Sequence, residues 1–201
     1  MMLIAHRRNT IEELIATPVK YGVEVDIRSY GDHLVIHHDP FVQGELFEAW
    51  LAFYNHGPLI LNVKEEGLEA RLIELMKLYE ISDFFFLDQS FPFLVRWSKL
   101  GESRCAVRVS EFESIDTAIT LSGKVGWVWV DCFTHFPLTH KDYKQLSDSG
   151  FKLCLVSPEL QGRNPEKEIS LLANFLVEND IHPDAICTKT PELWEKLVSF
   201  S

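Results

Sequence analysis

The chain has 201 residues, of which 46% are hydrophobic and 24% are charged, and its formal net charge is −11 at pH 7. These values are typical of a globular protein and exclude a disordered chain. The acidic charge argues against a nucleic-acid-binding protein, whose binding surface would be basic. The length predicts one domain over residues 1–201. Because no apolar run approaches the ~20 residues of a membrane span and the first residues lack a signal-peptide pattern, we expect no transmembrane segment and a cytoplasmic location.

Short apolar runs alternate with longer stretches of helical periodicity. The runs are rich in Val, Ile, Leu and Phe, as are strands that are buried on both faces. Residues 69–79 and 165–179 repeat apolar positions at intervals of three and four, which predicts helices, and Thr190 followed by Pro191 predicts a third helix start. Eight strands are predicted, at residues 3–6, 23–28, 59–64, 84–88, 105–109, 126–131, 152–156 and 184–188.

This alternation implies parallel strands joined by right-handed crossovers. Eight strand–helix units favour an α/β fold of the (β/α)8 TIM barrel type. The alternative is a doubly wound open sheet, although its Gly-x-Gly-x-x-Gly nucleotide-binding pattern is missing. Residues 29–38 depart from the alternation, because a turn at Gly31-Asp32 precedes a short apolar return. We therefore predict a small β-hairpin extension after the second strand, which would carry His37 and His38 over the barrel mouth.

The four cysteines lie in apolar runs and form no Cys-x-x-Cys pair, so we expect buried free thiols and no structural zinc site. Similarly, the aromatic runs at residues 84–86 and 127–129 are expected to be core. Phe133 and Phe136, which follow the sixth strand, are better candidates for lining a pocket. The cysteines are Cys105, Cys132, Cys154 and Cys187.

Polar residues gather at the predicted carboxyl ends of the strands, where the active sites of barrels form. Glu24 and Asp26 are two positions apart, so their side chains face the same way. Two hard oxygen ligands suit Mg2+ or Ca2+. The other interpretation is a partly exposed pair bonded to Arg7, Arg28 or Lys64.

His6 and His38 are candidates for acid and base, because a histidine can take and give a proton near neutral pH. A histidine in a strand can also be a core residue with satisfied hydrogen bonds. Arg7 presents a forked cation that suits a phosphate, and Lys64 offers a point charge for the same anion.

At these residues the sequence resembles the glycerophosphodiester phosphodiesterase family. That family is a (β/α)8 barrel with His-Arg-Gly after the first strand, Glu-x-Asp on the second, His-Asp on the hairpin and Glu-x-Lys on the third. The corresponding stretches here are IAHRRNT, VEVDIR, VIHHDP and LNVK, in the same order. LDQSF and DAICTKTPEL are weaker matches further along, so the resemblance spans the chain.

The resemblance implies a metal-dependent phosphodiester hydrolase of lipid metabolism that cleaves a small alcohol or sugar phosphodiester. His6 and His38 would be the acid and base. A substrate hydroxyl beside the phosphate would attack phosphorus, and water would open the resulting cyclic phosphate. Arg7 and Lys64 would bind the phosphate.

The implied cofactor is a divalent cation, Mg2+ or Ca2+, bound by Glu24, Asp26 and Asn62. Asn62 stands where the family has a third acidic ligand, so affinity for the cation should fall, unless another carboxylate compensates. Arg8 replaces the glycine of the first motif. The loop at residues 155–163 also departs from the family, and we expect Arg163 to bind a head group unlike glycerol, such as a sugar, with Glu159 as the other candidate.

Two alternatives remain open. The first is a non-catalytic barrel that binds a phosphorylated ligand or a partner protein, which the uncharged Asn62 favours. The second is a lyase that stops at the cyclic phosphate, as in metal-free phosphoinositide phospholipases. Association into a homo-oligomer is also left open.

Overall fold

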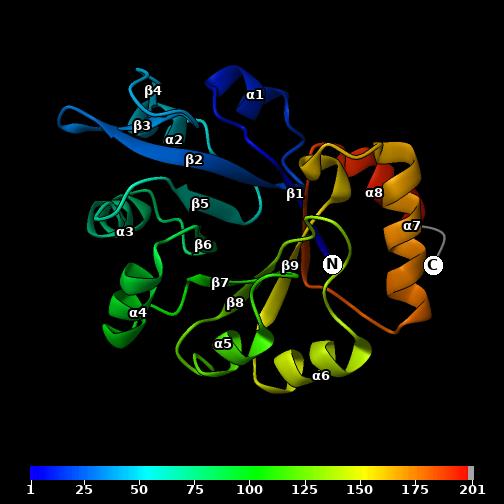
Figure 1. Ribbon diagram of the computed structural model, residues 1–201. Coiled ribbons are helices and arrows are strands. Elements are labelled where there is room, and N and C mark those ends of the chain that lie inside the picture. The colour runs from blue at the N-terminus through cyan, green and yellow to red at the C-terminus, as the bar shows by residue number, and fades with distance from the viewer. Residues whose placement is uncertain (199–201) are drawn as a thin grey trace.

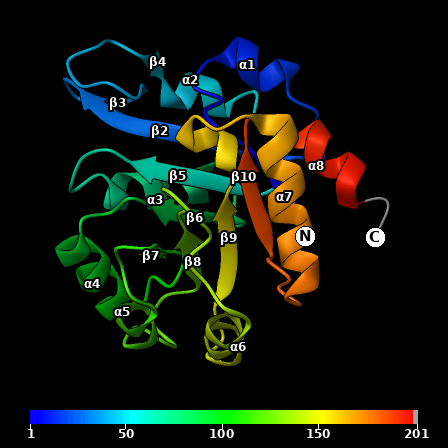
Figure 2. The same cartoon turned by 45° about the vertical axis from the view of Figure 1, so that its right-hand side comes forward.

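The structure, a computed structural model, describes residues 1–198, so the last three residues of the predicted 1–201 domain lie outside it. Eight parallel strands curl around a common centre, and the helices lie outside them (Figure 1; Figure 2). Each predicted strand is confirmed to within two residues at its ends. The strands are β1 (Met2–Ala5), β2 (Gly22–Tyr30), β5 (Leu59–Val63), β6 (Phe84–Leu87), β7 (Ala106–Val109), β8 (Trp127–Val130), β9 (Lys152–Val156) and β10 (Ala185–Thr188).

The helices follow the strands in the predicted alternation. The predicted helices at residues 69–79 and 165–179 are confirmed as α3 and α7, and the predicted helix start at Pro191 is that of α8. No helix in the described part of the chain is long and apolar enough to cross a membrane. The helices are α1 (Ile11–Ala16), α2 (Phe47–Leu51), α3 (Glu69–Leu78), α4 (Phe91–Lys99), α5 (Ile115–Ile119), α6 (His140–Asp148), the 3-10 helix η1 (Pro158–Gln161), α7 (Pro165–Glu178) and α8 (Pro191–Val198).

The order of the strands is that of a curled sheet. Neighbouring parallel strands are consecutive in the chain, and the first of them, β1, pairs with the last, β10. A doubly wound sheet would reverse its order next to the first strand, so this alternative is not the observed topology. Pairing is continuous from β7 through β10 and β1 to β6, whereas β6 and β7 meet at one bridge between Phe86 and Cys105.

An antiparallel segment extends β2 beyond the sheet. β3 (His33–Ile36) pairs with the end of β2 across the turn at Gly31, whose φ of +59° suits glycine, and β4 (Glu45–Leu46) pairs with β3. Directly after β3, the His37 backbone N–H donates to the Asp26 carbonyl at 3.0 Å. This bond holds the segment that carries His37 and His38 against the carboxyl end of β2.

Alternating residues divide the core into two parts. One set of side chains packs between the sheet and the helices. The other set fills the inside of the curled sheet, where Phe85 stacks on Trp127 with ring centroids 4.5 Å apart. The aromatic runs are thus core, as predicted, and the four cysteines are buried free thiols. Burial raises the pKa of the Cys105 and Cys132 thiols to about 12, so they stay protonated at neutral pH. The inner set is Ile4, Ile60, Phe85, Leu87, Ala106, Trp127, Trp129, Cys154, Val156, Ala185 and Cys187.

Candidate active site at the carboxyl ends of the strands

A polar layer lies directly above the inner apolar core. Side chains two positions apart on a strand point the same way, so the residue that follows an inner core residue by two also faces the centre. On β2 the outer core takes Val23, Val25 and Ile27, and the positions between them face inward. The inward polar residues on this basis are His6, Glu24, Asp26, Asn62, Arg108 and Asp131.

Glu24 is fully buried in this layer. Its carboxylate accepts a hydrogen bond from the Asn62 amide at 2.8 Å and another from the Arg7 backbone N–H at 2.8 Å. Burial and the neighbouring charge of Asp26 raise the pKa of Glu24 to about 7. The Glu24 carboxyl group therefore titrates near neutral pH in the absence of a cation.

Asp26 is also fully buried and is surrounded by donors. Asn9 holds it at two points: the Asn9 amide donates to the carboxylate at 2.8 Å, and the Asp26 backbone N–H donates to Asn9 at 3.1 Å. Arg7 Nε lies 3.3 Å from Oδ2, and Lys64 Nζ lies 3.2 Å from Oδ1. The structure thus brings Arg7, Lys64, Glu24, Asp26 and Asn62 together, as predicted. Asn9 was missed, because no local pattern links two residues 17 positions apart.

Arg7 adopts a backbone conformation that favours glycine. Its φ is +52°, and a non-glycine residue in this region is strained by about 1–3 kcal/mol. The conformation breaks the strand alternation after β1, so the backbone N–H reaches Glu24 while the guanidinium reaches Asp26. The Arg7 side chain is 42% exposed, which leaves it accessible to an anion. Arg8 has a structural role instead, since its Nε donates to Thr17 Oγ1 at 2.8 Å.

The two candidate histidines lie in different environments. The His6 side chain is 13% exposed, and its Nε2 lies 3.8 Å from a Glu24 oxygen. Burial and the positive charge of Arg7 lower the pKa of His6 to about 3, so its imidazole is neutral at pH 7. The His38 side chain is 44% exposed, and its Nδ1 lies 2.8 Å from Asp39 Oδ1. This hydrogen bond lowers the pKa of Asp39.

A chain of ion pairs with alternating charge continues around the mouth. Lys64 Nζ lies 3.3 Å from Asp88, Asp88 binds Arg108, and Arg108 donates to Asp131 at 2.9 Å. The Gln161 amide donates to the other Asp131 oxygen at 2.7 Å. Asp88 and Asp131, two nearby carboxylates that could replace the missing acidic ligand, thus bind Arg108.

Glu159 and Arg163, the two candidates in the loop after β9, do not join this group. Glu159 is 7% exposed, and its carboxylate accepts hydrogen bonds from Ser157, Thr188 Oγ1 (2.6 Å) and the Lys189 N–H (2.9 Å). These donors use its oxygens within the protein, so Glu159 stabilises the loops after β9 and β10. Arg163 donates to the Cys132 carbonyl and lines a separate cavity of about 420 Å3 with Phe136. Its role in substrate binding stays a prediction.

The donor set at β2 and β5 fits a hard divalent cation. Asp26 and Asn62 are register partners. The buried Asn62 Oδ1 accepts no hydrogen bond from the described residues, and the only partner of the buried Asp26 Oδ1 among them is the Lys64 ammonium, at 3.2 Å. An unsatisfied buried oxygen is costly, and Mg2+ and Ca2+ bind carboxylate and amide oxygens. In residues 1–198 no three His, Cys, Asp or Glu side chains are placed to hold a metal, so the Asn62 amide would have to complete a set with Glu24 and Asp26.

Comparison with known proteins shows the fold. No family model matches the sequence, and no curated protein is significantly similar to it. Among solved structures, the chain is similar to two from Agrobacterium tumefaciens str. C58, one assigned as a glycerophosphoryl diester phosphodiesterase and the other a glycerophosphodiester phosphodiesterase. They align with TM-scores of 0.70 and 0.66, at 14% identity in both cases, and cover 100% and 99% of this chain and 98% and 99% of theirs. A glycerophosphoryl diester phosphodiesterase from Parabacteroides distasonis ATCC 8503 aligns with a TM-score of 0.66 and 12% identity, over 99% of this chain and 86% of that one. The chain thus has the fold of these proteins over its whole length.

Proposed function

We propose that this chain is a phosphodiester hydrolase of the glycerophosphodiester phosphodiesterase type, on a short (β/α)8 barrel with a β-hairpin extension. The observation that carries the proposal is the convergence, at one mouth, of a neutral buried histidine, two fully buried carboxylates and two cations. The fold similarity to three phosphodiesterases supports it.

The proposed roles follow from these environments. Arg7 and Lys64 bind the phosphate and offset the charge that develops in phosphoryl transfer. Neutral His6 is the proton acceptor for the substrate hydroxyl that attacks phosphorus, and the negative charge of the bound phosphodiester would raise its low pKa toward neutrality. Asp39 holds His38 by Nδ1, which leaves Nε2 to donate a proton to the leaving alcohol. A divalent cation held by Glu24, Asp26 and Asn62 would stabilise negative charge on the phosphoryl oxygens.

One observation favours a second candidate, a barrel that binds a phosphorylated ligand without cleaving it. The uncharged Asn62 leaves the cation with two carboxylates, both of which already lie near Arg7 or Lys64. If the cation binds weakly, Arg7 and Lys64 can still bind a phosphate, but cleavage of the phosphodiester bond would be slow.

Phosphorus NMR of glycerophosphodiester hydrolysis tests the proposal, with Mg2+, with Ca2+ and with EDTA. We expect hydrolysis with a divalent cation, its loss in EDTA, and a loss of about 100-fold or more in the His6→Gln and His38→Gln variants. Arg71→Gln, which alters an exposed ion pair between α3 and Glu48 of α2, is the control. Absence of cleavage together with absence of cation binding by calorimetry would favour the binding barrel, and a persistent cyclic phosphate would indicate a lyase.

A further inference from the structure

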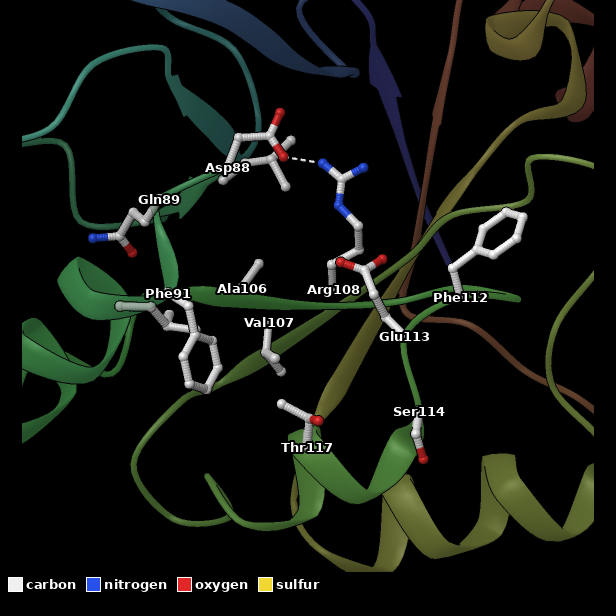
Figure 3. A pocket seen from close by; sticks show the side chains of 12 residues that line it. Asp88, Gln89, Phe91, Ala106, Val107, Arg108, Phe112, Glu113, Ser114 and Thr117 are labelled. Atoms are coloured by element: carbon white, nitrogen blue, oxygen red, sulfur yellow. Dashed lines mark hydrogen bonds and ion pairs between the residues drawn. The ribbon is translucent and has the colours of Figure 1, made fainter.

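A groove opens beside the candidate site, in the wall between β6 and β7. Its volume is about 610 Å3, which is within the ~300–1,000 Å3 range of small-molecule pockets. The groove has a clear cause. Asp88, directly after β6, has a φ of +59°, so the chain turns away from β7 two residues after the last pairing at Phe86. The two strands therefore separate toward the mouth, with α4 and α5 on either side (Figure 3).

Asp88 belongs to both the groove and the candidate site. It lines the groove, binds Arg108 on the far side and lies 3.3 Å from Lys64 Nζ. Lys64 in turn lies 3.2 Å from Asp26. A phosphate bound by Arg7 and Lys64 would therefore have one alcohol substituent next to the entrance of the groove.

The lining of the groove selects a class of ligand. It presents the acceptor carboxylates of Asp88 and Glu113, the donor guanidinium of Arg108, and the hydroxyl of Thr117, which can do both. The floor between them is apolar, and the ring of Phe112, 78% exposed, stands at the rim. Asp88 and Arg108 already pair with each other, and Glu113 accepts a hydrogen bond from Ser110, so the groove offers a ligand the remaining acceptor positions of the two carboxylates and the Thr117 hydroxyl. An aliphatic chain would cover these positions without using them, whereas a simple cation would face the guanidinium. A ring that carries several hydroxyl groups can donate to the carboxylates and accept from the guanidinium, while its carbon face packs on the aromatic ring.

We infer that this groove binds a neutral polyhydroxylated ring, of the monosaccharide or inositol class, as the alcohol portion of the phosphodiester. The inference rests on the proposed function for the position of the phosphate. The groove thus provides discrimination between head groups rather than catalysis.

The test compares three diesters that share glycerol phosphate and differ in the other alcohol: glycerophosphoinositol, glycerophosphoglycerol and glycerophosphocholine. We expect kcat/KM for the inositol diester to exceed that for the choline diester by about 10-fold or more. Phe112→Ala and Thr117→Val should lower kcat/KM for the inositol diester about 5-fold or more and leave the choline diester within 2-fold. Phe53→Ala is the matched control, because it removes another exposed aromatic ring (51%) that does not line the groove.

Calorimetric binding of the same three diesters to the wild-type protein and to these variants keeps the two proposals apart. If no diester is cleaved but the inositol diester binds most tightly and Phe112→Ala weakens it, the proposed function fails and the groove assignment stands. Equal or stronger binding and cleavage of the choline diester, or identical behaviour of Phe112→Ala and Phe53→Ala, overturns the groove assignment. Absence of binding of all three diesters overturns it as well.

Discussion

Around the mouth, β1, β2 and β5 are held together by continuous ladders, whereas β6 and β7 meet at one bridge. The first half carries two carboxylates with no exposed surface, and each of their oxygens faces a donor or a cation. The second half carries Asp88 and Arg108 with 27% and 29% of their side chains exposed. We therefore expect the two halves to have different roles. The tightly paired half holds the reacting groups in place, and the separated half binds the alcohol portion of the proposed substrate.

The largest effect is expected from Lys64→Met in the tightly paired half. Lys64 lies within 3.3 Å of Asp26 and Asp88, so its loss removes a phosphate-binding cation and leaves a buried carboxylate less well compensated. We expect kcat/KM to fall by ~100–1,000-fold for every diester, as for other groups that stabilise transition-state charge. Steady-state kinetics checks this, with Lys144→Met in an exposed i,i+4 pair as control. A loss confined to one diester would indicate that Lys64 binds the head group rather than the phosphate.

Asn62→Asp tests whether this half binds a cation. In EDTA a third carboxylate beside Glu24 and Asp26 should destabilise the protein by about 2–3 kcal/mol, because like charges would be buried together. Each kcal/mol corresponds to about 2–4 °C in Tm for a domain of this size. Millimolar Mg2+ or Ca2+ should restore the Tm, since a ligand that binds only the native state stabilises it.

Thermal unfolding with and without the cation measures this effect. Asn179→Asp, at the carboxyl end of α7, adds the same charge far from the β2 carboxylates and should show no response to the cation. A Tm for Asn62→Asp that does not depend on the cation would contradict the assignment of Asn62 as a ligand.

The pH dependence of stability provides the third test. The pKa of His6 falls from 6.5 to about 3 on folding, so between these values the unfolded chain binds one proton more, and stability rises with pH by about 1.4 kcal/mol per unit. The pKa of Glu24 rises from 4.5 to about 7, so the native state binds one proton more and stability falls with pH over that range. The two slopes offset each other between pH 5 and 6.

His6→Gln should expose the falling slope of Glu24, and Glu24→Gln should expose the rising slope of His6. Urea unfolding at half-unit pH steps in EDTA measures both. Parallel profiles for the two variants and the wild type would show that neither group titrates as its environment predicts.

The smallest effect is expected in the separated half. Arg108→Lys should keep one of the two ion pairs of Arg108, with Asp88 or Asp131, because a lysine lacks the forked geometry. We expect a loss of about 0.5–1 kcal/mol in the free energy of unfolding, since the guanidinium is partly solvated. Chemical denaturation measures this loss. The control is Arg71→Lys, which alters an exposed ion pair and is expected to leave the free energy of unfolding unchanged. A loss above about 3 kcal/mol would mean that the Asp88–Arg108–Asp131 chain holds the sheet together.

The strands and the inward polar residues could be predicted because both follow from a period of two. The apolar runs located the strands, and the same alternation then placed Glu24 and Asp26 on one face, whereas Asn62 was added to them by the family resemblance. Arg7 and Lys64 were found as cations at strand ends, which is a local property. These predictions needed no knowledge of which strands become neighbours.

What the sequence did not reveal depends on backbone geometry and distant contacts. The groove exists because Asp88 turns left-handed, and nothing around it distinguishes this aspartate from one at an ordinary strand end. Asn9 forms its two hydrogen bonds to Asp26 only when separate loops come together in the folded chain. The same holds for the hydrogen bonds that Glu159 accepts from Thr188 and Ser157. Polar residues in loops therefore looked equivalent before folding, although Glu159 stabilises loops and Asn9 holds a site residue.

The left-handed backbones of Arg7 and Asp88 have a consequence for protein engineering. Glycine at Arg7 or at Asp88 would relieve the left-handed strain, but at Arg7 it would leave the buried Asp26 without one of its two cations. Each replacement would also remove a charge from the mouth. The change in stability of Arg7→Gly and Asp88→Gly therefore measures the balance between the strain that is relieved and the ion pairs that are lost, and a library selected for turnover should retain both residues.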